Sequence, residues 1–225
     1  MKKSIFFMMI FSIVNSLLAQ ATVSPDEALK RLLEGNKRFI AGKSIRPNQT
    51  PEKVKELAAG QNPFAVIVGC SDSRVPNEII FDQGLGDIFI VRTAGQVSTY
   101  ASWGSMEFAV TSLGAKLILV LGHTKCGAVN AACAVPDVPG HIVTLINAIK
   151  PAAEIAKEME GDLLDNAVKV NVAKQVEQLR ALEPVLAKKV KSGEIKIVGA
   201  VYQLETGKVE LVPDNFLKKI SKEKK

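Results

Sequence analysis

The hydrophobic pattern of the chain alternates between two periods. Continuous apolar runs rich in Val and Ile occur four times, at residues 64–69, 88–92, 116–122 and 195–202. Runs of this kind are typical of strands that are buried on both faces of a sheet. A fifth run, 208–212, alternates apolar with polar residues after the Thr206-Gly207 turn, which predicts an antiparallel edge strand.

Helical periodicity fills the intervals between the predicted strands. Residues 26–42 place apolar side chains at helical spacing behind Ser24-Pro25, which is a helix start signal. Further helices are predicted over 101–113, 126–134, 140–158 and 162–192. This alternation predicts an α/β fold: a mostly parallel central sheet of four strands with an antiparallel edge strand, helices on both faces and an N-terminal helical arm.

The first 21 residues have the pattern of a signal peptide. Two lysines precede an apolar run at residues 5–14, and Ala19-Gln20-Ala21 has the small-x-small form of a cleavage site. A membrane anchor is the alternative, but the run is shorter than the roughly 20 apolar residues that a spanning helix needs. We therefore expect an exported protein, periplasmic in a Gram-negative host, in which residues 22–225 form a single domain with no membrane span after cleavage.

The net charge of +6 is concentrated at the two ends of the 225-residue chain. Lys2 and Lys3 lie in the leader, the tail 218–225 holds five Lys against one Glu, and residues 22–217 are therefore neutral. No basic face for nucleic acid is expected from this distribution. We expect the tail to be disordered and solvated, with contact to a membrane surface as the alternative.

The three cysteines are too few, and odd in number, for a disulfide framework in a chain of this length. Cys70 and His123 follow two predicted strands directly, and Cys126 lies three residues beyond His123. The carboxyl ends of parallel strands would bring these side chains to one rim of the sheet. Two thiolates and an imidazole suit a catalytic zinc with an open fourth position. Buried, apolar cysteines are the alternative, and packing is the expected role of Cys133.

Asp72 and Arg74 lie two positions apart in the loop after the first predicted strand. A guanidinium can hold a carboxylate in a bidentate pair, and a carboxylate released from it could turn to a metal. Beside the three candidate ligands, this pair predicts an acceptor for zinc-bound water. A loop-stabilising ion pair is the alternative.

Four segments together resemble the β-class carbonic anhydrases: CSDSRVP (70–76), RTAGQ (92–96), SMEFAV (105–110) and GHTKCGAV (122–129). The resemblance covers roughly residues 26–212. It implies one zinc per chain, bound by Cys70, His123 and Cys126, with Asp72 and Arg74 as a catalytic dyad. In the open form of the family, Asp72 orients a water or hydroxide at the fourth zinc position; in a closed form, Asp72 itself ligates the metal.

The resemblance also implies a substrate pocket across a dimer interface. Its apolar residues here are Phe89, Ala94 and Phe108, the last in place of a common tyrosine, and Gln61 matches the glutamine that members of the non-regulated type direct at substrate. Core packing is the alternative for the two phenylalanines. A tryptophan that marks a bicarbonate-regulated type is replaced by Ile67, so the plant-like, open-site type is expected.

The activity implied is zinc-dependent, reversible hydration of carbon dioxide to bicarbonate and a proton by zinc-bound hydroxide. Hydrolysis of a CO₂ analogue, carbonyl sulfide or carbon disulfide, is one alternative, and a non-catalytic zinc-binding or redox-sensing protein is another. We expect self-association to a homodimer or a tetramer, in which the N-terminal helix embraces a partner subunit. The apolar face of the helix predicted over 26–42 also supports this expectation, because such a face near a terminus must pack against another surface.

Overall fold

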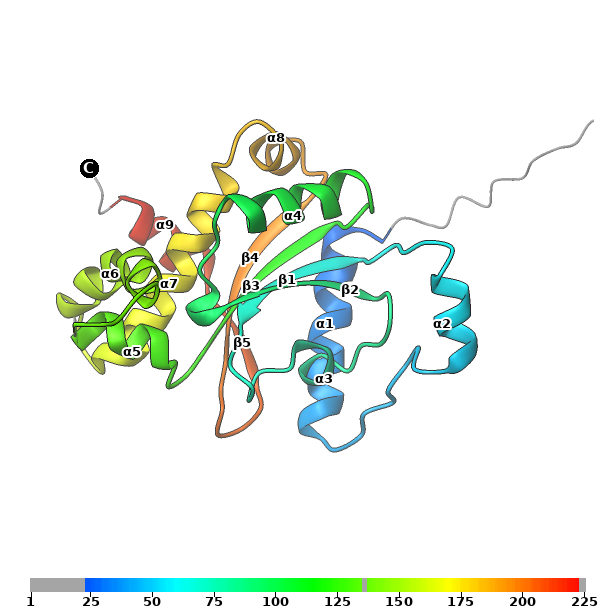
Figure 1. Ribbon diagram of the computed structural model, residues 1–225, viewed down its shortest axis with the longest axis horizontal. Coiled ribbons are helices and arrows are strands. Elements are labelled where there is room, and N and C mark those ends of the chain that lie inside the picture. The colour runs from blue at the N-terminus through cyan, green and yellow to red at the C-terminus, as the bar shows by residue number, and fades with distance from the viewer. Residues whose placement is uncertain (1–22, 135–136, 223–225) are drawn as a thin grey trace, which may run out of the picture.

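The computed structural model describes residues 23–134 and 137–222 (Figure 1). The predicted signal peptide, residues 1–21, and the last part of the tail, 223–225, lie outside the described residues. One sheet has the strand order β2-β1-β3-β4-β5. Its strands are β1 (Ala65–Cys70), β2 (Ile88–Thr93), β3 (Leu117–His123), β4 (Lys196–Tyr202) and β5 (Val209–Leu211).

The strand directions confirm the predicted sheet. β1 pairs in parallel with both β2 and β3, β3 pairs in parallel with β4, and β5 closes the edge antiparallel to β4. β1 and β3 are buried along their whole length, as their apolar runs predict. The prediction of burial on both faces is wrong for β2, which is half-buried throughout because it has a neighbour on one side alone.

Helices cover both faces of the sheet, as predicted (Figure 1). One face packs against α4 (Tyr100–Thr111), α5 (Gly127–Ala134), α6 (Ile142–Lys157), α7 (Leu163–Arg180), α8 (Leu186–Lys191) and α9 (Asp214–Lys222). The other face packs against α1 (Pro25–Ile40) and α3 (Asn77–Ile80). A short helix α2 (Pro51–Leu57) precedes β1, and a 3₁₀ turn η1 (Ala94–Gln96) follows β2. None of the described helices is long and apolar enough to cross a bilayer.

The first helix packs on the sheet of its own chain. Its N-terminus is capped by Ser24, whose hydroxyl accepts a hydrogen bond from the Glu27 N–H. Ala28 and Leu32 are fully buried against the sheet. The sheet of the same chain therefore covers part of the apolar face of α1, whereas Leu29 and Leu33 remain partly buried and Ile40 is 46% exposed.

The single helix predicted over 162–192 is wrong, because the structure divides this segment into α7 and α8. α7 ends at Arg180 and α8 begins at Leu186. Pro184 lies in the gap, where its missing N–H and its restriction of the preceding residue oppose a continuous helix.

The tail prediction is also wrong over residues 218–222, which belong to α9. Leu217 and Ile220 have exposed fractions of 4% and 1%, and α9 contacts α7. These two residues are three positions apart, so they share one helix face. That face packs into the core and leaves Lys218 and Lys219 exposed.

Candidate metal centre

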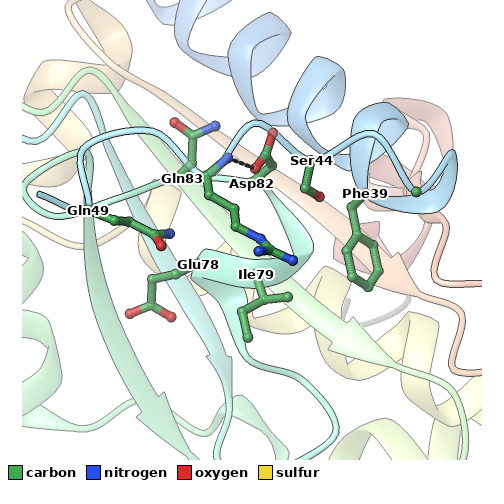
Figure 2. Close-up of a pocket in the computed structure, with 9 residues that line it drawn as sticks. Phe39, Ser44, Gln49, Glu78, Ile79, Asp82 and Gln83 are labelled. Carbon is green, nitrogen blue, oxygen red and sulfur yellow. Dashed lines mark hydrogen bonds between the residues drawn. The ribbon is translucent and has the colours of Figure 1, made fainter.

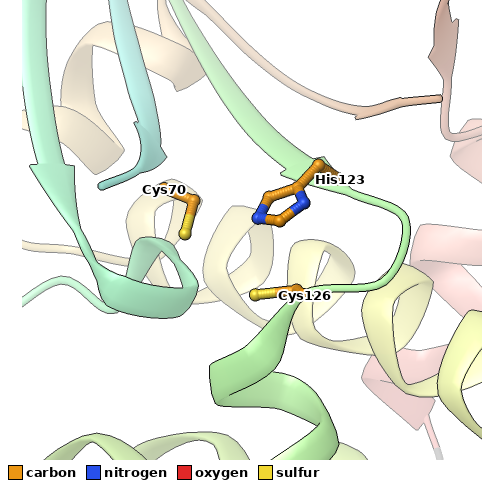
Figure 3. A group of neighbouring side chains, drawn as sticks. All are labelled: Cys70, His123 and Cys126. Atoms are coloured by element: carbon orange, nitrogen blue, oxygen red, sulfur yellow. The ribbon is translucent and has the colours of Figure 1, made fainter. Parts of the chain in front are cut away.

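The three predicted metal ligands meet at the carboxyl end of the sheet. Cys70 ends β1 and His123 ends the neighbouring parallel strand β3, while Cys126 immediately precedes α5. Their ligand atoms all lie within 4.8 Å of one another, and the two sulfur atoms and the imidazole face a common space (Figure 3). All three side chains are buried.

The hydrogen bonding of His123 fits a metal ligand. Its Nδ1 lies 2.9 Å from the Thr124 carbonyl oxygen, so Nδ1 carries the proton and donates it to that oxygen. The other nitrogen, Nε2, then presents a lone pair, and it is buried without a hydrogen-bond partner. Buried polar atoms are rarely left unpaired. A zinc ion held by His123, Cys70 and Cys126 would satisfy this one.

The two thiols form a coupled pair. A hydrogen bond from Cys126 lowers the pKa of Cys70 to about 4 against the opposing effect of burial, and two backbone N–H groups lower it further. One of these is the Gly95 N–H, 3.3 Å from the Cys70 sulfur. The pKa of Cys126 is raised because its thiol is hydrogen-bonded to Cys70 and buried. The pair therefore holds negative charge in a buried place, where a cation that binds displaces the remaining proton.

Asp72 and Arg74 form a bidentate ion pair beside the cluster. Arg74 donates from Nε to Asp72 Oδ1 at 2.9 Å and from Nη2 to Oδ2 at 2.7 Å, and its backbone N–H also donates to Oδ1. The hydrogen bond from the Arg74 side chain holds the pKa of the Asp72 carboxyl well below its usual range. Asp72 Oδ2 lies 3.7 Å from His123 Nε2. The structure thus has an ionised carboxylate, fastened by Arg74, at the edge of the metal centre.

Two further polar side chains hold the backbone around Cys70. Arg92 donates to the carbonyl oxygens of Cys70 and Asp72, at 2.8 Å each. Asn171 of α7 donates to the Gly95 carbonyl at 3.0 Å, in the turn whose N–H reaches the Cys70 sulfur. Gly95 has φ +67°, and a Cβ there would lie 2.6 Å from an Ile149 methyl carbon, so only glycine fits. Neither Arg92 nor Asn171 has a role that could be predicted from the sequence, although Arg92 is the first residue of the RTAGQ segment.

Comparison with known proteins decides the family. The carbonic anhydrase family profile matches residues 65–209, well over half of the chain. Carbonic anhydrase 2 of Mycobacterium tuberculosis is 44% identical over 192 residues, covering 84% of this chain and 93% of the relative. The chain belongs to the β-carbonic anhydrase family. Members of this family are zinc lyases that hydrate CO₂, so the expected enzyme class and zinc cofactor are confirmed.

Further similarities in sequence and in structure support this assignment. The carbonic anhydrase of Pseudomonas aeruginosa is 35% identical over 172 residues, covering 69% of this chain and 76% of its own. The structure of the β-carbonic anhydrase CcaA superposes with a TM-score of 0.68 at 25% identity, covering 83% of this chain and 96% of that one. A Coccomyxa β-carbonic anhydrase in complex with acetazolamide has a TM-score of 0.64 at 28% identity, covering 82% and 86%.

The substrate-pocket residues expected from the β-carbonic anhydrases are dispersed in a single chain. Ala94 follows Thr93, the β2 partner of Cys70, and so lies beside the cluster. Phe89 pairs with Val66 near the other end of β1. Gln61 precedes β1, whose six residues span roughly 17 Å at about 3.3 Å per residue, so it lies near the opposite end of the strand from Cys70. Phe108 is 51% exposed on α4.

A separate cavity of about 590 Å³ lies between the end of α1 and α3 (Figure 2). The buried carboxylate of Asp82 accepts hydrogen bonds from Arg38 Nε at 2.6 Å and from the N–H groups of Ile45 and Arg46. The last of these is the dashed line in Figure 2. Burial alone would raise the pKa of Asp82, but these hydrogen bonds lower it overall. Asp82 therefore anchors the loop that follows α1. Its hydrogen bonds account for a buried carboxylate at this position, so no ligand is needed to explain it.

Proposed function

We propose that this chain catalyses the reversible hydration of carbon dioxide to bicarbonate and a proton. The observation that carries the proposal is the unpartnered His123 Nε2, which faces the sulfur atoms of Cys70 and Cys126 in a β-carbonic anhydrase fold. These three residues would hold one zinc ion per chain. Bound zinc lowers the pKa of a water ligand to roughly 7 and so supplies a strong nucleophile near neutral pH.

Asp72 acts by orientation rather than as a base. Its lowered pKa keeps the carboxylate ionised at neutral pH, and a base this weak takes up a proton poorly there. An ionised carboxylate still accepts hydrogen bonds, and Arg74 fixes the direction from which Asp72 accepts one. Arg74 also keeps Asp72 from turning to the metal, so the pair maintains the open form.

A second copy of the chain completes the substrate pocket. β2 is a half-buried edge strand, and an edge of this kind is a ready surface for pairing with another chain. In a homodimer, or a tetramer built from it, Gln61, Phe89 and Phe108 of one copy would approach the metal centre of the other. The amide of Gln61 would donate to a substrate oxygen as charge develops on it, and the phenylalanines would form a wall suited to apolar CO₂.

Mixing two inactive variants tests this shared pocket. Cys70→Ala removes a metal ligand and leaves Gln61, while Gln61→Ala leaves the metal ligands. When equal amounts are unfolded and refolded together, each mixed dimer has one complete site, and hydration should recover to roughly a quarter of the native rate for random pairing. If the pocket were completed within one chain, the mixture would stay as inactive as its components.

The substrate is tested by direct comparison. The zinc-loaded protein should hydrate CO₂ in a stopped-flow assay with a pH indicator and hydrolyse carbonyl sulfide far more slowly. The reverse preference would replace the proposal with hydrolysis of a CO₂ analogue. Zinc binding without either activity would replace it with a non-catalytic zinc protein.

We also propose export to the periplasm, on the sequence pattern of residues 1–21 alone. Expression of the full chain in a Gram-negative host, followed by fractionation, tests it. A periplasmic product that begins near Thr22 is expected, whereas an uncleaved cytoplasmic product would contradict the proposal.

A further inference from the structure

Thr124 is held from three directions by the turn between β4 and β5. Its N–H donates to the Tyr202 carbonyl at 3.0 Å. Its hydroxyl accepts the Leu204 N–H at 3.0 Å and donates to Glu205 Oε2 at 3.3 Å. Both the backbone and the side chain of Thr124 are therefore fixed by residues about 80 positions later in the sequence.

The carbonyl of the same residue orients the metal-binding histidine. The Thr124 oxygen accepts the Nδ1 proton of His123 at 2.9 Å. This bond selects the tautomer in which Nε2 has a free lone pair, and it also limits rotation of the ring. The position of the Thr124 carbonyl thus determines where Nε2 points.

The next residue shows that this loop needs support. Lys125 has φ +53°, a left-handed conformation that is costly for a residue with a side chain. Its ammonium group lies 2.5 Å from Glu205, and its carbonyl accepts a hydrogen bond from Arg74 Nη2 at 3.5 Å. Glu205 therefore contacts two consecutive residues of the loop that joins His123 to Cys126.

The turn itself is fastened to the body of the protein. Asn36 of α1 is buried; its amide donates to the Gly207 carbonyl at 2.8 Å and accepts the Val209 N–H at 2.9 Å. The same amide donates to the Ile80 carbonyl in α3. Because buried hydrogen bonds of this kind leave little freedom, the turn is a rigid support rather than a loose loop.

We propose that Thr124 is a positioning residue for the metal centre, through which the β4–β5 turn sets the tautomer and direction of His123. The inference rests on the proposed function only in that Cys70, His123 and Cys126 hold zinc. It assigns Thr124 no contact with substrate. Its consequence is that removal of the hydroxyl should weaken metal binding although all three ligands remain.

The test compares Thr124→Val with Thr124→Ser and with Thr206→Val. Thr206 is a matched control because it lies in the same turn and its hydroxyl accepts the Lys208 N–H, without a bond to the metal loop. Zinc affinity is measured by competition with a chelator, and the Co²⁺-substituted proteins are compared by their thiolate-to-metal charge-transfer bands. T124V keeps the carbonyl that bonds to His123 and removes the hydroxyl that fixes it, so zinc binding should weaken by roughly 10-fold, the lower end of the range for a lost partner of a metal ligand, and the Co²⁺ spectrum should change. T124S and T206V should match the native protein.

Native affinity and spectrum in T124V would overturn the proposal, as would equal losses in T124V and T206V. If T124V does not fold, Glu205→Ala decides the matter, with Glu210→Ala as its control in the same hairpin. Both glutamates are exposed and each pairs with a lysine, but Glu210 pairs with Lys208 and not with the metal loop. Weaker zinc binding in E205A alone would support the proposal, and unchanged binding would overturn it. Native protein that binds no zinc would instead refute the proposed function.

Discussion

At the scale of single residues, the chemistry depends on which polar atoms of the site have hydrogen-bond partners and which do not. His123 Nε2 is buried and unpaired, whereas both carboxylate oxygens of Asp72 are bonded to Arg74. The first arrangement favours a cation at the ligands. The second keeps a negative side chain next to that cation without allowing it to coordinate.

Substitutions in the pair should separate rate from metal binding. Asp72→Asn keeps the shape of the side chain and removes its charge, so zinc content should stay native while CO₂ hydration falls by about 100-fold as the orienting acceptor is weakened. Arg74→Ala frees Asp72 to turn to the metal, with zinc retained and hydration again low. Zinc per chain and stopped-flow hydration are measured on the same samples. Near-native turnover in either variant would contradict the role of the pair.

Asp82 gives a prediction about stability and pH. Its carboxylate is buried and bonded to Arg38 and to two backbone N–H groups, so Asp82→Asn should lower the free energy of unfolding by roughly 2 kcal/mol at pH 7. The folded-state pKa is lowered, so the stabilisation is fully present above the unfolded value of about 3.9 and is lost as pH falls through the folded value.

Urea unfolding between pH 3 and 8 checks this prediction. The difference between the native protein and D82N should be constant from about pH 5 upward and should shrink at lower pH. A difference that grows as the pH falls would show that the carboxylate does not stabilise the fold in its ionised form.

At the scale of secondary-structure elements, the features that could be predicted from the sequence are those set by the local hydrophobic pattern. The apolar runs place all five strands, and the ligands that follow β1 and β3 are brought together as expected. Strand order is not local, so the edge position of β2, and with it the partial burial of that strand, could not be predicted from its apolar run.

The supports of the site were missed for the same reason. Asn171 bonds to a carbonyl 76 positions earlier, and Leu204 to a hydroxyl 80 positions earlier. In the sequence, Asn171 lies in a predicted helix and Leu204 in a turn, and neither belongs to a recognisable motif. Motifs around Cys70 and Cys126 therefore identify the ligands, whereas the residues that orient them emerge from the fold.

The C-terminal helix shows how a strong charge pattern can mask packing. The lysines of 218–225 favoured a solvated tail, but Ile220 is 1% exposed in contact with the main core. Ile220→Ala should therefore cost about 2–4 kcal/mol in the free energy of unfolding, as for other large-to-small core substitutions. Lys218→Ala, on the exposed side of the same helix, should cost less than about 0.5 kcal/mol. Equal, small effects of the two variants in urea unfolding would show that the helix does not pack on the core.

At the scale of the whole molecule, the metal ligands lie together in one chain, whereas the expected substrate-binding residues do not. One chain brings the three metal ligands and the Asp72–Arg74 pair to one rim, whereas Gln61 lies at the other end of β1. Zinc binding should therefore be a property of each chain. CO₂ hydration should require the assembled protein, which the mixing of the two variants tests.

The proposed activity depends on a zinc ion held by Cys70, His123 and Cys126. The most direct test measures zinc per chain and stopped-flow CO₂ hydration together, in the native protein and in C70A, H123A and C126A, with Cys133→Ala as a control outside the cluster. The native protein and C133A should hold about one zinc per chain and hydrate CO₂, while the three ligand variants lose both properties. Ligand variants that keep their zinc, or a zinc-loaded native protein that hydrates no CO₂ between about pH 6.5 and 9, around the roughly neutral pKa of zinc-bound water, would contradict it.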